Sequence, residues 1–164
     1  MASTITASTM KVTISENITL NGRQQGGSQT FSIASINEIF KRIVTCPANQ
    51  DTTVALFQSA VSDNIESLGL DTQDVKYIRV TNLDDTNAVN VSLQIDAGED
   101  DSAADESGTI ALAAGQSFIM GTSHDSVCVN DTNATIDTTL HDLESILIDP
   151  AANAVDVEIF VASI

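Results

Sequence analysis

Residues 75–95 read VKYIRVTNLDDTNAVNVSLQI, and this stretch indicates the fold class. Apolar and polar side chains alternate over residues 75–82 and again over residues 88–95, which is the period of a strand with one buried face. Between them, residues 83–87 are rich in Asp and Asn, which favour turns. We therefore predict two strands joined as a hairpin. The side chains that the second strand should bring to the core are Val89, Val91, Leu93 and Ile95.

The alternation recurs on both sides of this stretch. Residues 39–46 fit a helical stripe or a strand; we favour a strand, because β-branched residues lead into Pro47 and the residue before a proline avoids the helical conformation. Residues 138–145 are expected to form a short helix or a turn. Counting about eight to ten short strands predicts an all-β, antiparallel β-sandwich of jelly-roll or immunoglobulin-like type. The remaining expected strands span residues 11–20, 30–36, 52–58, 109–113, 116–120 and 154–164, with a short strand near residues 127–129.

The last expected strand carries an aromatic ring on its outer side. Val155, Val157, Ile159 and Val161 share one parity and should face the core, so Phe160 falls on the opposite face. We expect Phe160 to lie at a bend or to contact another copy of the chain, which makes it the candidate oligomer contact.

The N-terminal region differs in composition from the rest. Residues 1–10 are polar and rich in Ser and Thr, without the basic and apolar regions of a secretory signal. Asn21-Gly22 and residues 26–28 interrupt the first strand pattern. We expect an extended arm with the first strand over residues 1–29 and one sandwich domain over residues 30–164. Such arms become ordered on a partner.

Charge is distributed unevenly along the 164 residues. The net charge is −17, from 23 acidic and 6 basic residues. All six basic residues lie within residues 1–79 beside seven acidic ones, which leaves residues 80–164 with sixteen acidic residues and no Lys or Arg. We predict two surfaces of different charge. The scarcity of basic residues argues against a free nucleic-acid binder, and no run of about 20 apolar residues indicates a membrane span.

One acidic segment offers weak candidate cation ligands. Asp96, Glu99, Asp100 and Asp101 fall close together, and oxygen-rich loops can bind Ca²⁺. The helix–loop–helix calcium pattern fails, because its Gly and Glu positions are occupied by Asp101 and Ser107. We expect a solvated loop, with no metal and no cofactor.

Two His-Asp pairs, His124-Asp125 and His141-Asp142, raise the possibility of a metal site with Cys128 or of catalysis. Their spacing matches no known ligand pattern, and no Ser lies in a nucleophile elbow. We therefore expect no enzyme; a pocket that brings both histidines and Asp125 together would reverse this. Cys46 and Cys128 are expected to be buried thiols, and their pairing stays open.

Three segments together resemble small virion structural proteins of marine tailed bacteriophages, particularly cyanophages. They are residues 74–84 (DVKYIRVTNLD), 111–120 (ALAAGQSFIM) and 154–163 (AVDVEIFVAS). The resemblance implies a β-sandwich protein that decorates the capsid or belongs to the tail or fibre. It implies no catalytic residue.

From this resemblance we expect a capsid decoration (cement) protein that docks on the major capsid protein lattice and stabilises the shell. It would be assembled in the host cytoplasm and reside in the virion as a homo-oligomer, with a trimer favoured, and would bind neither nucleic acid nor membrane. Lys11, Arg23, Lys41 and Arg42 are the candidate contacts to acidic capsid groups. The alternatives are a tail, neck or fibre component and, from another class, a calcium- or glycan-binding β-sandwich module.

Overall fold

The protein is all-β, and a computed structural model describes residues 5–58, 69–96, 106–129, 136 and 138–164. The chain divides into two compact units. We call residues 1–38, with which Ile164 groups, the arm, and residues 39–163 the sandwich. The one helical element among the described residues is a single 3₁₀ turn, η1 (Thr72–Asp74).

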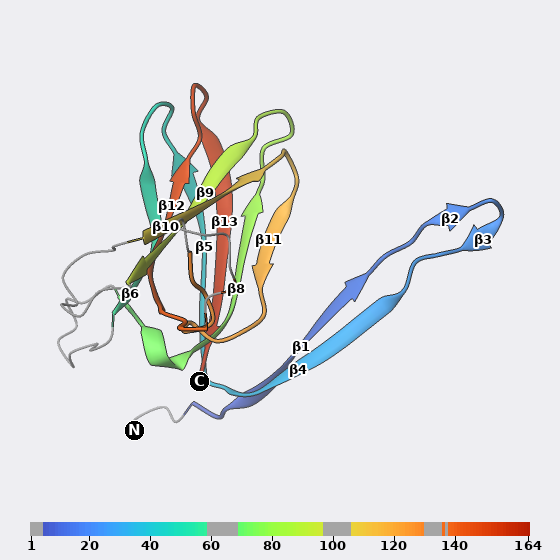
Figure 1. The fold of residues 1–164 in the computed structure, drawn as a ribbon, viewed down its shortest axis with the longest axis horizontal. Coiled ribbons are helices and arrows are strands. Elements are labelled where there is room, and N and C mark those ends of the chain that lie inside the picture. Colours follow the sequence, from blue (N-terminus) through green and yellow to red (C-terminus); the bar gives the residue numbers. More distant parts are fainter. Residues whose placement is uncertain (1–4, 59–68, 97–105, 130–135, 137) are drawn as a thin grey trace. The chain divides into compact units, whose positions relative to one another are not determined.

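The arm is a long antiparallel ribbon of two strands, β1 (Ser8–Ser15) and β4 (Ser28–Ile36) (Figure 1). Its tip continues as the short pair β2 (Thr19–Leu20) and β3 (Arg23–Gln24). Asn21 and Gly22 close the tip with φ angles of 51° and 74°, the left-handed conformation that two-residue hairpin turns require. The sequence pattern Asn-Gly therefore makes a turn within a ribbon.

The ribbon extends further along the chain than the sequence predicted. We expected the sandwich to begin at residue 30, but residues 28–36 pair with β1, and the division between the units follows Glu38. The register shifts near the base of the ribbon, where Ser35 adopts a φ of 65°. An extra residue in one strand is a β-bulge, which bends the strand locally.

The sandwich contains two sheets that share one hydrophobic core. In the five-stranded sheet the order is β10 (Glu106–Leu112), β9 (Val89–Asp96), β12 (Asp142–Asp149), β6 (Thr52–Gln58) and β7 (Leu70–Asp71). In the four-stranded sheet the order is β11 (Ser117–Met120), β8 (Val75–Asn82), β13 (Val155–Ser163) and β5 (Glu38–Cys46).

The core is made by alternate side chains of the central strands, as the sequence predicted. The four apolar side chains expected from β9 and the four expected from β13 are all buried. Strands β8 and β12 add Ile78, Val80, Ile146 and Ile148, all with 1% exposure or less. Burying a side chain of this size stabilises the fold by about 1.5–3 kcal/mol. The expected strand at residues 39–46 is also confirmed by β5.

The predicted hairpin of residues 75–95 is wrong. Strands β8 and β9 have nearly the predicted bounds, but they lie in different sheets, so residues 83–88 cross from one sheet to the other. Asn82, which is fully buried, fixes this crossing: its Nδ2 donates to the carbonyl oxygens of Asn87 (2.9 Å) and Leu112 (3.2 Å). Its Oδ1 accepts from the Asp84 amide at 3.0 Å. These bonds tie the end of β8 to the end of β10 in the opposite sheet.

The expected short helix or turn over residues 138–145 is wrong from residue 142 onward. Residues 142–149 form strand β12, which pairs with both β9 and β6 in the centre of its sheet. The helical spacing of Leu143 and Ile146 arises because a register shift between Leu143 and Ser145 lets both side chains face the core.

We predict that Asn82→Ala destabilises the protein by about 2–4 kcal/mol, because it removes a buried amide and leaves buried carbonyls without their donor. Chemical denaturation measures the effect. Asn90→Ala on the exposed side of β9 is the control and should change stability by no more than about 0.5 kcal/mol. Equal effects of the two substitutions would contradict the role given to Asn82.

Candidate interaction surfaces

One face of the arm is mostly apolar, with Gln29 opposite Ile14 as its polar exception. Met10 lies opposite Ile33, and Val12 opposite Phe31, while Ile14 continues the same side of β1. We call these five side chains the apolar face of the arm. The other face is polar: Thr13 and Thr30 lie opposite each other there, with their hydroxyl oxygens 2.9 Å apart.

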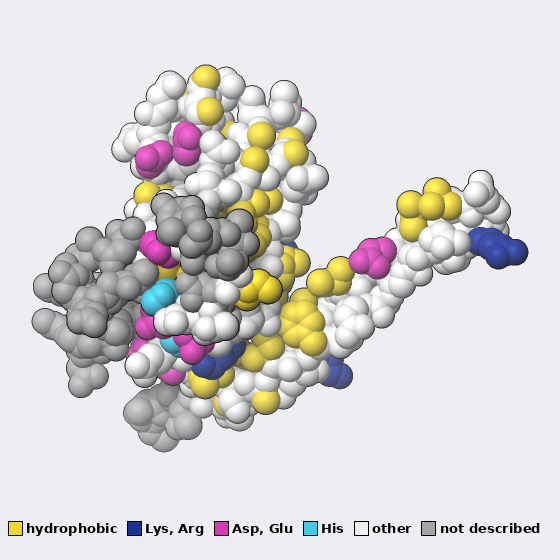
Figure 2. All heavy atoms as spheres, in the orientation of Figure 1, with side chains coloured by type: hydrophobic (Ala, Val, Ile, Leu, Met, Phe, Trp, Pro, Cys, Tyr) yellow, Lys and Arg dark blue, Asp and Glu magenta, His cyan; other side chains and the backbone are white. Residues whose placement is uncertain are grey.

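The ribbon buries this apolar face only in part: Met10, Val12, Phe31 and Ile33 are partly buried, and Ile14 is exposed. Ile14 remains 41% exposed, and Ile18 and Leu20 near the tip are 47% and 55% exposed. Figure 2 shows apolar side chains along the arm with charged groups at few places. A two-stranded ribbon is only marginally stable in water, because one strand pair gives its side chains no opposing layer. The apolar face is therefore a candidate interaction surface. Sequence reasoning identified this alternation as that of a half-buried strand, within an arm over residues 1–29 that was expected to become ordered on a partner.

The pairing between β1 and the start of β4 also depends on one glycine. A Cβ atom at Gly26 would lie 2.0 Å from the backbone oxygen of Glu16. The Glu16 amide donates to the Gly27 oxygen at 2.8 Å, so the two backbones approach closely at this point. Only glycine permits that approach, and the ribbon continues to its tip as a result.

The outer face of the four-stranded sheet is a second candidate surface. Phe160 of β13 lies opposite Arg79 of β8, which in turn lies opposite Ile119 of β11. On β5, Phe40 and Val44 pack against the core, so Ile43 faces outward, and it is 62% exposed. Ile39 shares this parity and is 49% exposed. We call this set, with Lys41 and Glu158, the outer face of the four-stranded sheet.

Phe160 lies on the outward side, as the sequence predicted, and has two neighbours there. The Tyr77 ring meets it edge-on, with centroids 6.0 Å apart and an interplanar angle of 79°. The Arg79 guanidinium carbon lies 5.7 Å from the Phe160 ring centroid, a cation–π distance. The predicted contact of Phe160 with another copy stays a prediction.

Charges of both signs meet on this face. Glu158 forms an ion pair with Lys41 at 3.0 Å and another with Arg79. Nearby, Thr45 Oγ1 donates to Asp156 Oδ1 at 2.6 Å. The prediction that the basic and acidic halves of the chain form two separate surfaces is therefore wrong here. The reason is topological: β13 from the acidic half lies between β5 and β8 from the half that holds all the basic residues.

The four candidate capsid contacts are divided equally between the two units. Lys11 and Arg23 lie on the arm, and Lys41 and Arg42 lie on β5 in the sandwich. Lys41 is engaged by Glu158, and the Arg42 guanidinium carbon lies 4.9 Å from the Phe40 ring centroid. Their role at a capsid stays a prediction.

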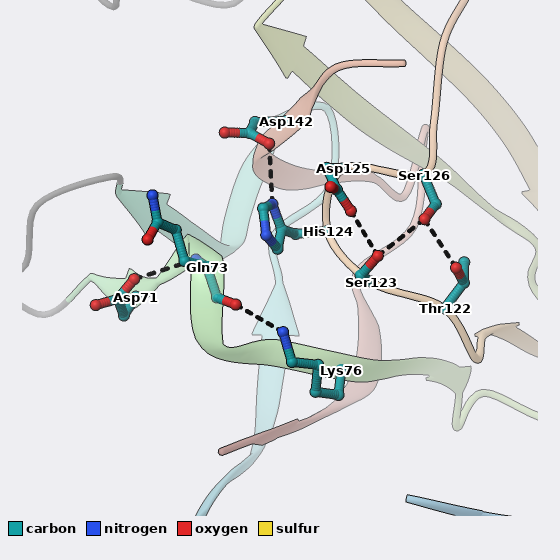
Figure 3. Close-up of polar contacts among 9 residues, drawn as sticks. All are labelled: Asp71, Gln73, Lys76, Thr122, Ser123, His124, Asp125, Ser126 and Asp142. Carbon is teal, nitrogen blue, oxygen red and sulfur yellow. Dashed lines mark hydrogen bonds and ion pairs between the residues drawn. The ribbon is translucent and has the colours of Figure 1, made fainter. Parts of the chain in front are cut away.

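The histidine-containing segments form a polar network on the connection before β12 (Figure 3). His124 Nδ1 lies 2.9 Å from Asp142 Oδ1, and His124 is largely buried. The Ser123 hydroxyl donates to Asp125 Oδ1 at 2.5 Å. This hydrogen bond is the main reason why the pKa of Asp125 lies below its usual value. The contacts hold the segment in place.

The contacts that the structure describes give His124, Asp125 and His141 different partners, and the expectation of no enzyme stays a prediction. The His141 backbone amide donates to the Val127 oxygen at 2.9 Å, forming an isolated bridge, while the His124 ring is directed to Asp142. Within the part of the chain that the structure describes, no group of three or more His, Cys, Asp or Glu side chains is placed to bind a metal.

The weak cation candidates cannot be compared with the structure. Glu99, Asp100 and Asp101 lie outside the described residues, and Asp96 is described only by its backbone as the last residue of β9. Cys46 and Cys128 do not form a disulfide with each other. Cys46 is buried, and burial raises the pKa of its thiol, whereas Cys128 is partly exposed, so the expectation of two buried thiols holds for Cys46 alone.

The outer face of the five-stranded sheet contains a polar hollow of about 480 Å³. Asp51 and Asp149 contribute carboxylates to it, and the Asn90 amide lies 3.4 Å from Asp149 Oδ2. Ser92 and Thr109 add hydroxyl groups. Sequence analysis did not identify this hollow, since its residues come from four separate segments; the outward parity of Asn90 and Ser92 was its one visible signal.

Comparison with known proteins leaves the chain without a family. No family model and no curated protein matches the sequence. Among solved structures, it is similar to a chain reported under the heading "Bacillus endospore appendages form a novel family of disulfide-linked pili". The identity is 13%, the TM-score is 0.38, and the match covers 99% of this chain and 94% of that one. In the described residues, no helix is long and apolar enough to cross a membrane.

We predict that Asp125→Asn lowers the melting temperature near pH 6 by no more than about 3 °C, since the group is exposed. Because the pKa of Asp125 is depressed in the folded state, its contribution is present above the unfolded pKa of about 3.9 and is lost as the pH falls through the folded pKa. The difference from wild type should therefore vanish at the most acidic pH. Ser123→Ala should behave alike; a difference independent of pH would contradict the assignment.

Proposed function

We propose that this chain is a non-enzymatic structural subunit of a virion, a capsid decoration protein that docks on the major capsid protein lattice and stabilises the shell. The single observation that carries the structural role is the apolar face of the arm. An apolar face on a two-stranded ribbon is stable when a neighbouring protein covers it. The virion assignment itself is supported by the sequence resemblance.

The rest of the molecule suits this role. A decoration protein needs a rigid body and a segment that engages neighbours. The core between the two sheets and the buried Asn82 crossing supply rigidity. The excess of acidic residues keeps the body soluble and resists contact between bodies. A tail, neck or fibre component would use the same features. The protein that the arm binds therefore distinguishes a decoration protein from these alternatives.

We predict that the purified chain co-sediments with assembled capsid shells that lack decoration protein. Val12→Asp and Phe31→Asp should each reduce the bound fraction at least tenfold, because a charge would be buried in the contact. The matched control is Thr13→Asp, on the opposite face of the same strand, which should bind as wild type does. Failure of the wild type to sediment with shells would overturn the capsid role. Equal binding of all variants would show that the apolar face of the arm is not the surface that contacts the shell.

A second function has one observation in its favour. The polar hollow on the five-stranded sheet presents carboxylate, amide and hydroxyl groups, which are the groups that bind Ca²⁺ or sugar hydroxyls. It supports the calcium- or glycan-binding alternative.

For this second function, millimolar Ca²⁺ should raise the melting temperature of the wild type, because a ligand that binds only the folded state stabilises it. Asp149→Asn should abolish the increase, while Asp85→Asn, on the connection between the sheets, should leave it unchanged. No shift with Ca²⁺ in the wild type would eliminate the calcium form.

A further inference from the structure

We propose that the apolar face of the arm binds the outer face of the four-stranded sheet in a second copy of this chain. This inference deepens the proposed structural role, since it names one partner of the arm within the assembly. It rests on the structural role and not on the identity of the shell.

The two faces match in length and in chemical character. Strands β1 and β4 have 8 and 9 residues, and β5, β8 and β13 have 9, 8 and 9. At about 3.3 Å per residue, the strands that carry the two faces are about 26–30 Å long. One face presents five apolar side chains of the ribbon, and the other presents Ile39, Ile43, Ile119 and Phe160. Stacking the ribbon on the sheet would supply the opposing layer that each lacks.

Charge selects this surface of the acidic body as the acceptor. Residues 39–164 contain four basic and twenty-one acidic residues, so two bodies repel each other, whereas residues 1–38 contain two of each and are neutral. On the outer face of the four-stranded sheet, Lys41 and Arg79 already neutralise Glu158. A second copy can therefore approach this face through its neutral arm with little electrostatic repulsion.

The contact is heterologous, because the surface that binds differs from the surface that is bound. Each copy then has one donor face, on the arm, and one acceptor face, on the sheet. Heterologous contacts give closed rings when the rotation between copies closes and open chains when it does not. A trimer, the oligomer favoured from the sequence, would be the closed form with three such contacts.

Two variants that each disable one face test the proposal. Phe31→Asp disables the donor face, and Ile43→Asp disables the acceptor face. In sedimentation velocity at physiological salt, wild type should form oligomers as its concentration rises, and each variant alone should raise the concentration for half-assembly at least tenfold. Leu56→Asp, at an exposed apolar position of β6 in the other sheet, is the control and should assemble as wild type does.

Mixing the two variants gives the decisive result. The intact arm of Ile43→Asp can bind the intact sheet face of Phe31→Asp, so an equimolar mixture should form dimers and no larger species. Both substitutions are at surface positions, and unchanged melting temperatures would show that the variants fold. Assembly of Ile43→Asp like wild type, absence of dimers in the mixture, or a wild type that stays monomeric would each overturn the proposal.

These failures are distinct from failure of the proposed function. A wild-type chain that stays monomeric yet sediments with capsid shells would overturn the contact between copies and retain the decoration role. A chain that assembles with itself but does not bind shells would do the reverse.

Discussion

Burial of alternate side chains between two opposing layers is the interaction on which this structure depends. In the sandwich it is satisfied: β9 and β12 of one sheet face β8 and β13 of the other, and their inward side chains are almost fully buried. In the arm the same alternation is present, but the ribbon has no second layer of its own. That contrast explains why the arm, and not a pocket or a cluster of titratable groups, is the main candidate for function.

Charge decides which protein surface can provide the missing second layer for the arm. An acidic body repels its own copies at most points of its surface. Topology changes this on one face, because β13 brings Glu158 between two basic side chains that the sequence places far away. The resulting balance of charge lies beside exposed isoleucines and Phe160, so this surface combines balanced charge with apolar side chains. The position of β13 in the sheet order thus leaves one surface where copies of an otherwise strongly acidic body can associate.

Much of the fold could be predicted from the sequence because strand periodicity is a local property. Residues 52–58 and 75–82 form strands with the predicted bounds, and the outward position of Phe160 followed from parity alone. The hairpin prediction failed because the partner of a strand is not local. Residues 83–87 resemble a hairpin turn, but hydrogen bonds from Asn82 to Leu112 direct the chain into the other sheet.

The same limit applies to the candidate surfaces. Alternation in residues 10–14 revealed an apolar side but not that its layer would be missing, since that depends on pairing with residues 29–33. The sequence has a half that holds all the basic residues and a strongly acidic half, and we predicted that each half forms its own surface. In the structure, strands from the two halves lie side by side in one sheet. The polar hollow was invisible because its lining comes from four separate segments. In each case the sequence shows the type of each residue, but it does not show which residues will be its neighbours in space.

The central claim is that a neighbouring copy covers the apolar face of the arm. Hydrogen exchange of the wild-type chain, measured by mass spectrometry over a range of protein concentrations, tests it most directly. The account predicts that amides of residues 10–14 and 29–33 become protected as concentration rises, together with those of β5, while the core strand β9 stays protected throughout. Protection of the arm that is the same at every concentration would contradict it.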